Sequence, residues 1–240
     1  MTKIFNTPDP ASLKRAAAAR ALEYVQDGMK LGLGTGSTAE AFLELLAERV
    51  RSGLKIIGTP TSERTEDKAK TLGIPIEELD KLAPLDLVID GADEADLNLD
   101  LIKGGGGALL REKIVAASGA RMIVIADETK LVPRLGAFPL PVEVITFGHK
   151  TTAARIEKAA ASLGYPEMKP VLRQKDRRRY RTDSRNCIYD CPFGAIDDAP
   201  RLASVLSSIP GVVDHGLFIG IASALVLAGA GGVKVIERKP

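Results

Sequence analysis

The stretch LIKGGGGALLREKI, residues 101–114, sets a lysine, four consecutive glycines and a glutamate between a strand-like and a helix-like segment. Each glycine costs about 0.5–1 kcal/mol relative to alanine in a regular element, so four in a row need a physical reason. The run Gly104–Gly107 can expose successive backbone N–H groups, and such amides stabilise developing oxyanion charge. Lys103 adds a cation, and Glu112 can act as a general base. This stretch therefore predicts a proton-transfer site rather than a flexible linker.

A second glycine-rich turn, GLGTGSTA at residues 32–39, also precedes a helix-like segment. Gly34 and Gly36 permit a tight turn, and the hydroxyls and amides of Thr35–Thr38 suit a phosphate at the start of the helix. The relaxed dinucleotide pattern, which ends in alanine, fits this turn as well. However, the next strand-like stretch, IIGTPTS, ends without the acid that would hold a ribose. The phosphate of a small molecule is therefore favoured over a dinucleotide, with a purely structural turn as a further alternative.

A third stretch, DGADE at residues 90–94, closes an apolar run with three carboxylates. Clustered carboxylates raise one another's proton affinity, and as pure acceptors they suit a hydroxyl-rich ligand. A metal site is one alternative, although no histidine lies close in the sequence and Mg²⁺ usually recruits phosphates as well. Loop capping is another. The sequence by itself leaves the roles of Asp90, Asp93 and Glu94 open among these three.

The elements that must position these stretches follow from the hydrophobic pattern. Over the first 130 residues, strand-like runs alternate with helix-like segments. The strand-like runs are MKLGLG, LKIIGT, LDLVIDGADE and RMIVIAD, and the helix-like segments are residues 11–27, AEAFLELLAERV, SERTEDKAKTLG (with Ser62 as its cap) and ALLREKIVAASG. This alternation predicts an α/β fold, with a parallel sheet covered by helices on both faces. Because ligands bind outside the carboxyl ends of such strands, the three stretches are expected to meet at one edge.

The pattern changes after about residue 132. A proline-punctuated stretch ends in a strand, and it is followed by a helix near 151–163, strand-like pieces around 171–173 and 186–191, and a helix at 198–207. We therefore predict a smaller α+β domain over residues 133–207, inserted into a larger catalytic domain of residues 1–132 plus 208–240. The short runs VVDHGLFIG and ALVLAG are expected to rejoin the first sheet.

Two features of the smaller domain have structural interpretations. The basic run QKDRRRYRTDSR, residues 174–185, is interpreted as a solvated hairpin, with a nucleic-acid patch as the alternative. Cys187 and Cys191 lie in a strand-like segment and are too far apart to bridge easily. We expect them to be buried thiols in a reducing compartment.

Composition argues against several classes of protein. The chain has 240 residues, a net charge of +2, no tryptophan and only 4% aromatic residues, so it has neither a basic field nor a stacking platform for nucleic acid. The sequence contains no run of about 18 apolar residues, so no membrane span is predicted. The N-terminus lacks the apolar core of a signal peptide. We therefore expect a cytoplasmic protein that binds neither nucleic acid nor membrane.

The segments GTGSTA, DGADE, KGGGGALLREK, FPLPVEV and IPGVVDHGLF occur in this order, and as an ordered set they resemble A-type ribose-5-phosphate isomerase. The resemblance covers about residues 11–236. It implies a Rossmann-like domain with an inserted smaller α+β domain, assembled as a homodimer or homotetramer. It also implies interconversion of D-ribose 5-phosphate and D-ribulose 5-phosphate in the pentose phosphate pathway, with no cofactor and no metal.

The resemblance assigns roles to particular residues. Glu112 corresponds to the proton-transfer glutamate, with Asp90, Asp93 and Lys103 as further catalytic candidates. Substrate-binding positions fall on Thr35, Gly36, Ser37, Thr38, Asp90, Gly91, Ala92, Asp93, Lys103, Gly104, Gly105, Gly106, Lys130 and Lys14. The turn TDSRN, which has Arg185 where the family usually has glycine, departs from the pattern, as does Ser223 where aspartate is common. His215 is left open between a site residue and a structural one.

The mechanistic hypothesis is a single-carboxylate isomerisation. Asp93 or Asp90 assists ring opening, and Glu112 then moves a proton from C2 to C1 through a cis-enediolate. The glycine-run amides and Lys103 would hold the negative charge of this intermediate. The alternatives are a non-catalytic sugar-phosphate sensor of the same fold and an NAD-dependent oxidoreductase, the latter disfavoured by the missing ribose acid.

Overall fold

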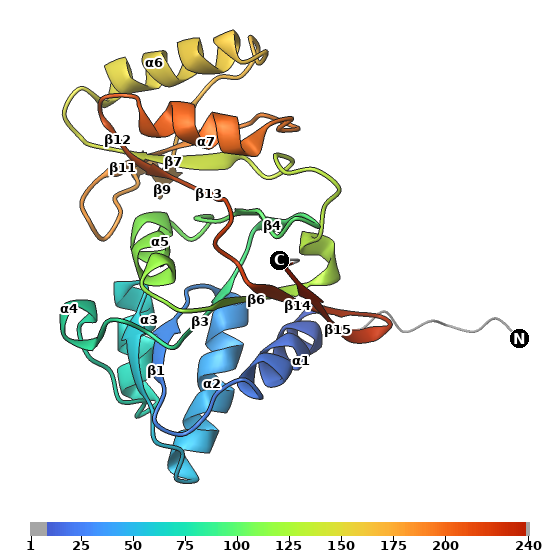
Figure 1. The fold of residues 1–240 in the computed structure, drawn as a ribbon. Helices are drawn as coiled ribbons and strands as arrows, with labels where there is room; N and C mark the ends of the chain where they lie inside the picture. Colours follow the sequence, from blue (N-terminus) through green and yellow to red (C-terminus); the bar gives the residue numbers. More distant parts are fainter. Residues whose placement is uncertain (1–8, 239–240) are drawn as a thin grey trace, which may run out of the picture.

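The computed structural model describes residues 9–238, and its largest feature is a six-stranded sheet (Figure 1). The strand order is β15–β14–β6–β3–β1–β2. The bounds are β1 Lys30–Leu33, β2 Ile57–Pro60, β3 Leu87–Gly91, β6 Met122–Asp127, β14 Ala224–Gly229 and β15 Gly232–Glu237. All neighbours run parallel except β14 and β15, which form an antiparallel hairpin at one edge. The predicted parallel sheet is confirmed, whereas β15 is a strand that was not predicted from the sequence.

Helices cover both faces of this sheet, as the alternation predicts (Figure 1). They are α1 Pro10–Leu22, α2 Ser37–Arg51 and α3 Glu63–Thr71 on one face, and α5 Leu109–Ala117 with the short α4 Leu79–Leu82 on the other. Along β6, Ile123 packs against the core of α1 and α2, whereas Val124 packs against the core of α5. A strand that is buried on both faces becomes a continuous apolar run, and this explains why β6 was readily predicted. Within residues 9–238, no helix is both long and apolar enough to cross a membrane.

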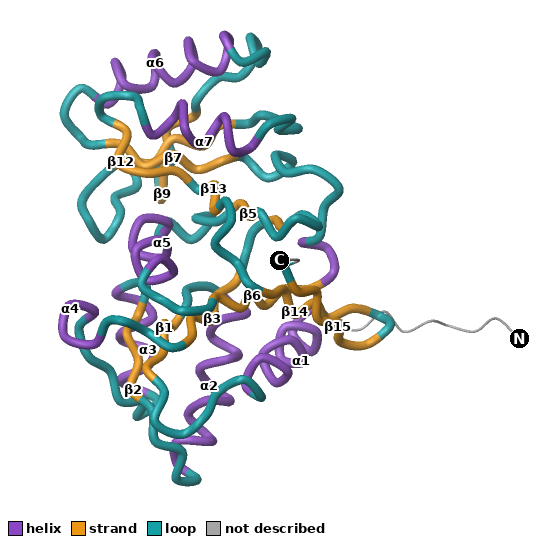
Figure 2. Tube along the Cα trace, viewed as in Figure 1, coloured by secondary structure: helices purple, strands orange, loops and turns teal. Residues whose placement is uncertain are grey.

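A three-stranded antiparallel sheet lies above the α5 face of the large sheet (Figure 2). Its order is β13 Leu217–Phe218, β5 Leu101–Ile102 and β4 Glu94–Ala95. Leu101 and Phe218 have no exposed surface, and they belong to the same core as α5. Because β5 ends at Ile102, this small sheet determines where Lys103 and the glycine run begin.

The rest of the chain forms a four-stranded antiparallel sheet with two helices packed on it (Figure 2). The order is β12 Val212–His215, β7 Leu140–Val144, β11 Cys187–Cys191 and β8 Val171–Leu172, and the helices are α6 His149–Ser162 and α7 Ala199–Ser207. The basic run forms the exposed hairpin β9 Gln174–Lys175 and β10 Arg178–Arg179, as predicted. Cys187 and Cys191 are free and fully buried, so the prediction of buried thiols is confirmed.

One predicted strand belongs to a different sheet from the one expected. ALVLAG does rejoin the six-stranded sheet as β14, but VVDH pairs with β7 as β12. The prediction for VVDH is therefore wrong, because Val212 packs in the core shared with α6 and α7. The division into two domains stays a prediction, and this pairing favours a boundary after His215 rather than after residue 207.

Candidate active site

The three predicted stretches meet at the carboxyl edge of the large sheet. β1, β3 and β6 are adjacent parallel strands, and the chain order reverses between β1 and β3, where ligands of open α/β sheets bind. A cavity of about 460 Å³ opens there. Every predicted site residue except Asp90 lines it. Five lining residues were not predicted, namely Pro10, Leu13, Asp127, Glu128 and Thr129. Asp127 carried a usable signal, since it is an acid at the end of an apolar strand, as Asp90 is.

A buried lysine and two buried carboxylates form the floor of the cavity. Lys103 Nζ lies 2.9 Å from Asp90 Oδ2 and 3.5 Å from Glu112 Oε1, and it donates a 2.6 Å hydrogen bond to Gly91 O. None of the three residues is more than 4% exposed. Charged groups at this depth are costly unless they are paired, so one cation among several acids makes an unusual electrostatic site.

Burial decides the protonation of these acids. It raises the pKa of Glu112 to about 8, although Lys103 opposes the effect and Asp90 and Asp93 add to it. Burial likewise raises the pKa of Asp90 against the pull of Lys103. For Lys103 itself, burial works to lower the pKa, but Asp90 and Glu112 outweigh it and hold the pKa above its ordinary value. Lys103 is therefore a stable cation, and the Glu112 carboxyl has a pKa of about 8.

Glu112 presents one free oxygen inside this site. It lies in the first turn of α5, a helix anchored by the buried side chains of Leu109 and Val115. Among the described residues, Glu112 Oε2 has no hydrogen-bond partner although it is buried. A buried oxygen without a partner is destabilised as an anion and gains a proton readily. Glu112 lines the cavity, so this oxygen can exchange a proton with a bound molecule.

Asp90 supports the site from behind. Its Oδ1 accepts hydrogen bonds from Thr35 N at 3.0 Å and Gly91 N at 2.7 Å, which ties the loop after β1 to the loop after β3. A Cβ at Gly34 would lie 2.2 Å from this same oxygen, so only glycine permits the approach. Asp90 is completely buried and does not line the cavity, in contrast to Asp93.

The glycine run is folded tightly rather than extended. Gly104 and Gly107 have φ values of 98° and 85°, which other residues rarely adopt. The Gly105 N–H donates to Asp93 Oδ2 at 2.7 Å, and the Gly107 N–H donates to Gly104 O at 2.9 Å. These two amides are therefore occupied, and the expectation that the run as a whole binds an oxyanion is wrong for them. The Gly106 N–H has no acceptor within residues 9–238.

The other end of the cavity suits a phosphate. α2 begins after Gly36, no side chain caps its first N–H groups, and Gly36, Ser37 and Thr38 line the cavity. Lys14 on α1 donates from Nζ to Ser37 Oγ at 2.9 Å, which brings a cation to this helix end. Lys130, in the short 3-10 helix η1 Glu128–Lys130, lines the same cavity.

One predicted hydroxyl faces away from this end. Thr35 Oγ1 lies 2.7 Å from Thr61 Oγ1, 2.8 Å from Ser62 Oγ and 3.0 Å from Thr65 Oγ1. These three partners are at most 5% exposed. Thr35 therefore anchors its loop to β2 and α3, and its hydroxyl is unavailable to a phosphate. Of the predicted hydroxyls, Ser37 and Thr38 are the two left for that role.

Two further sequence candidates have structural roles. Glu94 accepts hydrogen bonds from Gly136 N at 2.7 Å and Phe138 N at 2.5 Å, so it holds a loop outside the cavity. His215 Nε2 lies 3.1 Å from Ser207 Oγ and 3.0 Å from Ala203 O. Burial lowers the pKa of His215 to about 4, so the ring stays neutral at physiological pH. His215 lines no part of the cavity.

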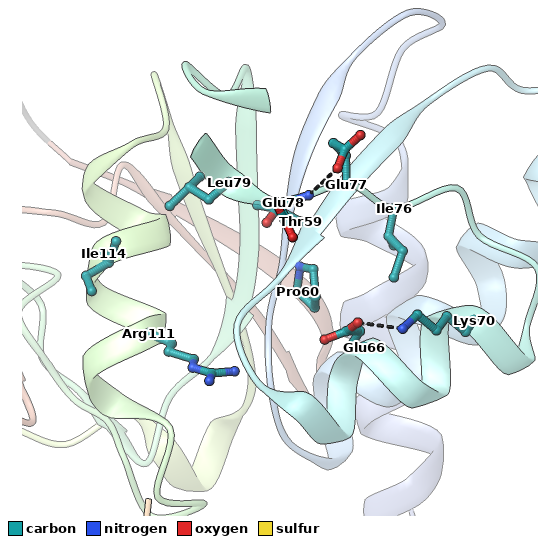
Figure 3. A pocket seen from close by; sticks show the side chains of 10 residues that line it. All are labelled: Thr59, Pro60, Glu66, Lys70, Ile76, Glu77, Glu78, Leu79, Arg111 and Ile114. Carbon is teal, nitrogen blue, oxygen red and sulfur yellow. Dashed lines mark hydrogen bonds and ion pairs between the residues drawn. The ribbon is translucent and has the colours of Figure 1, made fainter. Parts of the chain in front are cut away.

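A second cavity of about 350 Å³ lies between α3, α4 and the outer face of α5 (Figure 3). Its charged lining groups include the Glu66–Lys70 ion pair, with side chains 39% and 59% exposed, and Arg111, which is 38% exposed. These groups are solvated, in contrast to the buried cluster around Lys103. The charged groups of the second cavity are therefore not desolvated as those of the first one are, and this favours the first cavity as the candidate active site.

Together these features define a Rossmann-like α/β protein with a desolvated acid–lysine cluster and a candidate anion site at the switch point of its sheet. Comparison with known proteins agrees. The profile of the family described as "Ribose 5-phosphate isomerase A (phosphoriboisomerase A)" matches residues 57–232. The chain is 59% identical over 228 residues to ribose-5-phosphate isomerase A of Nitrobacter hamburgensis, covering 95% of this chain and 98% of the relative. It is 60% identical over 226 residues to the protein of that name from Rhodopseudomonas palustris, covering 94% and 97%.

Solved structures show the same relationship. The ribose 5-phosphate isomerase from Plasmodium falciparum has a TM-score of 0.91 and 39% identity, covering 96% of this chain and 100% of its own. A D-ribose-5-phosphate isomerase in complex with phospho-erythronic acid has a TM-score of 0.89 and 38% identity, covering 96% and 100%. The chain belongs to the ribose-5-phosphate isomerase A family, which is a family of enzymes.

Proposed function

We propose that this protein interconverts D-ribose 5-phosphate and D-ribulose 5-phosphate through a cis-enediolate, as part of the pentose phosphate pathway. The relatives are named for this substrate. The observation that carries the proposal is the free, buried Oε2 of Glu112 beside the Lys103 cation. A base that titrates near pH 8 next to a fixed cation suits the removal of a proton α to a carbonyl.

The phosphate is proposed to bind at the start of α2. Ser37 and Thr38 offer hydroxyls and backbone N–H groups there, and Lys14 and Lys130 offer positive charge. These contacts are remote from the reacting carbons. Their binding energy can therefore position C1 and C2 beside Glu112 without taking part in the chemical step.

Ring opening precedes proton transfer, because the substrate must expose its carbonyl group. Asp93 is the favoured assistant, since it lines the cavity whereas Asp90 is enclosed behind it. The Asp93 carboxylate already holds Gly105 N, which fixes its orientation. Asp93 can take the ring hydroxyl proton and return it to the ring oxygen as the C1–O bond opens.

Glu112 then takes the proton from C2, and the electron pair of the C2–H bond forms the C1=C2 double bond while the carbonyl oxygen O1 becomes negative. Lys103 and the Gly106 N–H are proposed to stabilise this charge. The O2 hydroxyl proton passes to the neighbouring O1, and Glu112 returns its proton to C1 as C2=O forms. One carboxylate serves both carbons because they are adjacent.

An assay of the purified chain tests the proposal. Ketopentose phosphate formed from ribose 5-phosphate is measured with and without added NAD. Product without NAD supports the isomerase. No product from correctly folded protein that still binds the sugar phosphate would instead identify a sensor, and a requirement for NAD would identify an oxidoreductase.

We also propose that the chain assembles as a homodimer or homotetramer. Phe147 is 89% exposed and Leu97 is 71% exposed, and large apolar side chains so open to solvent favour cover by another subunit. Light scattering gives the mass directly, and a mass of one chain would contradict this proposal.

A further inference from the structure

The smaller part of the molecule contacts the glycine run through an arginine. Arg173 lies between β8 and β9, and its Nη1 donates to Gly104 O at 2.9 Å and to Gly105 O at 3.1 Å. The rest of the guanidinium is held by Asp190 on β11, to which Nε donates at 2.9 Å and Nη2 donates as well. Because the guanidinium donates to both oxygens of the Asp190 carboxylate, its plane is fixed. Arg173 is therefore a rigid support for the carbonyls of Gly104 and Gly105.

A tyrosine from the basic run makes the next contact. Tyr180 follows β10, and its hydroxyl donates to Gly106 O at 3.2 Å. Burial raises the pKa of this hydroxyl, so it stays protonated and able to donate. A Cβ at Gly107 would lie 2.2 Å from the Tyr180 oxygen, so the missing side chain at Gly107 makes room for it. The segment that follows the hairpin thus supplies one hydrogen-bond donor, the Tyr180 hydroxyl, to the glycine run.

These contacts determine where the amides of the run point. In a trans peptide, the carbonyl of one residue and the N–H of the next point in opposite directions. Arg173 holds the carbonyls of Gly104 and Gly105, so the N–H groups of Gly105 and Gly106 point away from it. The 2.7 Å bond from the Gly105 N–H to Asp93, a lining residue of the cavity, agrees with this reasoning.

We propose that Arg173 and Tyr180 are positioning residues: Arg173 orients the peptide between Gly105 and Gly106 so that the Gly106 N–H faces the enediolate, and Tyr180 holds the Gly106 carbonyl and so fixes the next peptide of the turn. Arg173 also polarises this peptide, because a cation on its carbonyl makes its N–H a stronger donor. The inference rests on the proposed isomerase function. It explains why the glycine run that follows β5 is held by side chains that adjoin β8 and β10.

The test compares Arg173→Gln with Arg178→Gln. Arg178 lies on the β9–β10 hairpin that follows Arg173, is exposed, and makes no hydrogen bond to the glycine run within residues 9–238, so its substitution removes the same charge without the same bonds. Loss of one oxyanion donor lowers kcat by about 100–1,000-fold, and a misaligned donor loses part of that. We expect kcat of Arg173→Gln to fall about 10–100-fold, with KM within threefold of the unmodified protein. Arg178→Gln should keep both values.

Affinities for two ligands distinguish a positioning role of Arg173 from a merely structural one. Phospho-erythronic acid combines a phosphate with a carboxylate whose negative charge can stand in for that of the enediolate, whereas inorganic phosphate tests the proposed α2 site alone. We expect Arg173→Gln to bind phospho-erythronic acid at least fivefold more weakly and inorganic phosphate equally well. Equal loss of both ligands, or an unchanged kcat, overturns the proposal.

Tyr180→Phe removes a single hydroxyl and covers the case in which Arg173→Gln fails to fold. Its kcat should fall about threefold or more with KM unchanged, and an unchanged kcat in this variant overturns the role of Tyr180. If the unmodified chain lacks isomerase activity, the proposed function fails, but the two binding measurements still decide whether Arg173 orients the glycine run.

Discussion

Glu112→Gln separates a catalytic carboxylate from a structural one, because it should lower activity and raise stability together. The substitution keeps the shape of the side chain and removes its ability to ionise. General acid–base catalysis contributes about 100–10,000-fold to a rate. With Glu112 proposed to serve both proton transfers, we expect kcat to fall at least 100-fold while KM changes little. In the unmodified protein, kcat/KM should rise with pH through about 8, since the proposed mechanism needs Glu112 ionised in the free enzyme.

The stability effect follows from the two pKa values of Glu112. The pKa is about 8 in the folded protein against an ordinary value of 4.5, so the folded state binds more protons between these two pH values. Stability must then fall as pH rises from 4.5 to 8. At 1.36 kcal/mol per pKa unit, the gap corresponds to at most about 5 kcal/mol. Glutamine carries no charge, so the variant should exceed the unmodified protein by up to about 4 kcal/mol at pH 8 and by about 1 kcal/mol at pH 5.

Urea titrations at pH 5 and pH 8 measure the free energy of unfolding, and the coupled isomerase assay measures kcat. Glu167→Gln is the matched control, because Glu167 is exposed and the same substitution there should change neither quantity. Activity near the unmodified level, or a variant less stable than the unmodified protein at pH 8, would refute the assignment of Glu112 as a buried base.

Three further predictions concern the same site. Lys103→Met should cost about 3–5 kcal/mol of stability at pH 8, because it leaves Asp90 and Glu112 buried without a cation. The loss should be smaller at pH 5, where protons on the carboxylates replace the cation. Urea titrations at both pH values measure the two losses, and equal losses would contradict this prediction. Lys14→Ala should raise KM about tenfold with kcat nearly unchanged, since it removes a proposed phosphate contact that is remote from the reacting carbons. The exposed control Lys55→Ala should alter neither value, and a fall in kcat alone would place Lys14 elsewhere in the mechanism. EDTA should leave the initial rate unchanged, and activity that disappears with the chelator and returns with Mg²⁺ would contradict the metal-free mechanism.

The loops of the site were predictable because each follows a strand whose residues are apolar on both faces. The ends of such strands are local features, and Asp90 and Gly34 stand directly at them. The contacts between loops were not predictable in the same way. Lys103 Nζ lies 2.9 Å from Asp90 only because β5 crosses above the large sheet, and the sequence shows no signal for that crossing.

The outcome of competing effects was also beyond the sequence. Whether burial or Lys103 has the larger effect on the pKa of Glu112 depends on how much water reaches the carboxylate. Residues from several elements determine this access. Arg173 was overlooked for a related reason. It adjoins an exposed basic hairpin, and its anchor, Asp190, lies on a neighbouring strand, so no periodic pattern connects the two. The prediction for the strand pairing of VVDH was wrong for the same reason, since a short apolar run does not specify its partner strand.

The two cysteines give the molecule a built-in reporter of local opening. Both belong to β11, and the six-stranded sheet with its helices contains none of the chain's thiols. Burial raises the pKa of Cys191 well above its ordinary value, so a reactive thiolate forms only when this strand becomes exposed to water. The rate at which a thiol reagent labels the native protein therefore measures how often the four-stranded sheet opens, independently of the six-stranded sheet. Cys191 directly follows Asp190, so the same kinetics also register how firmly the arginine anchor is held.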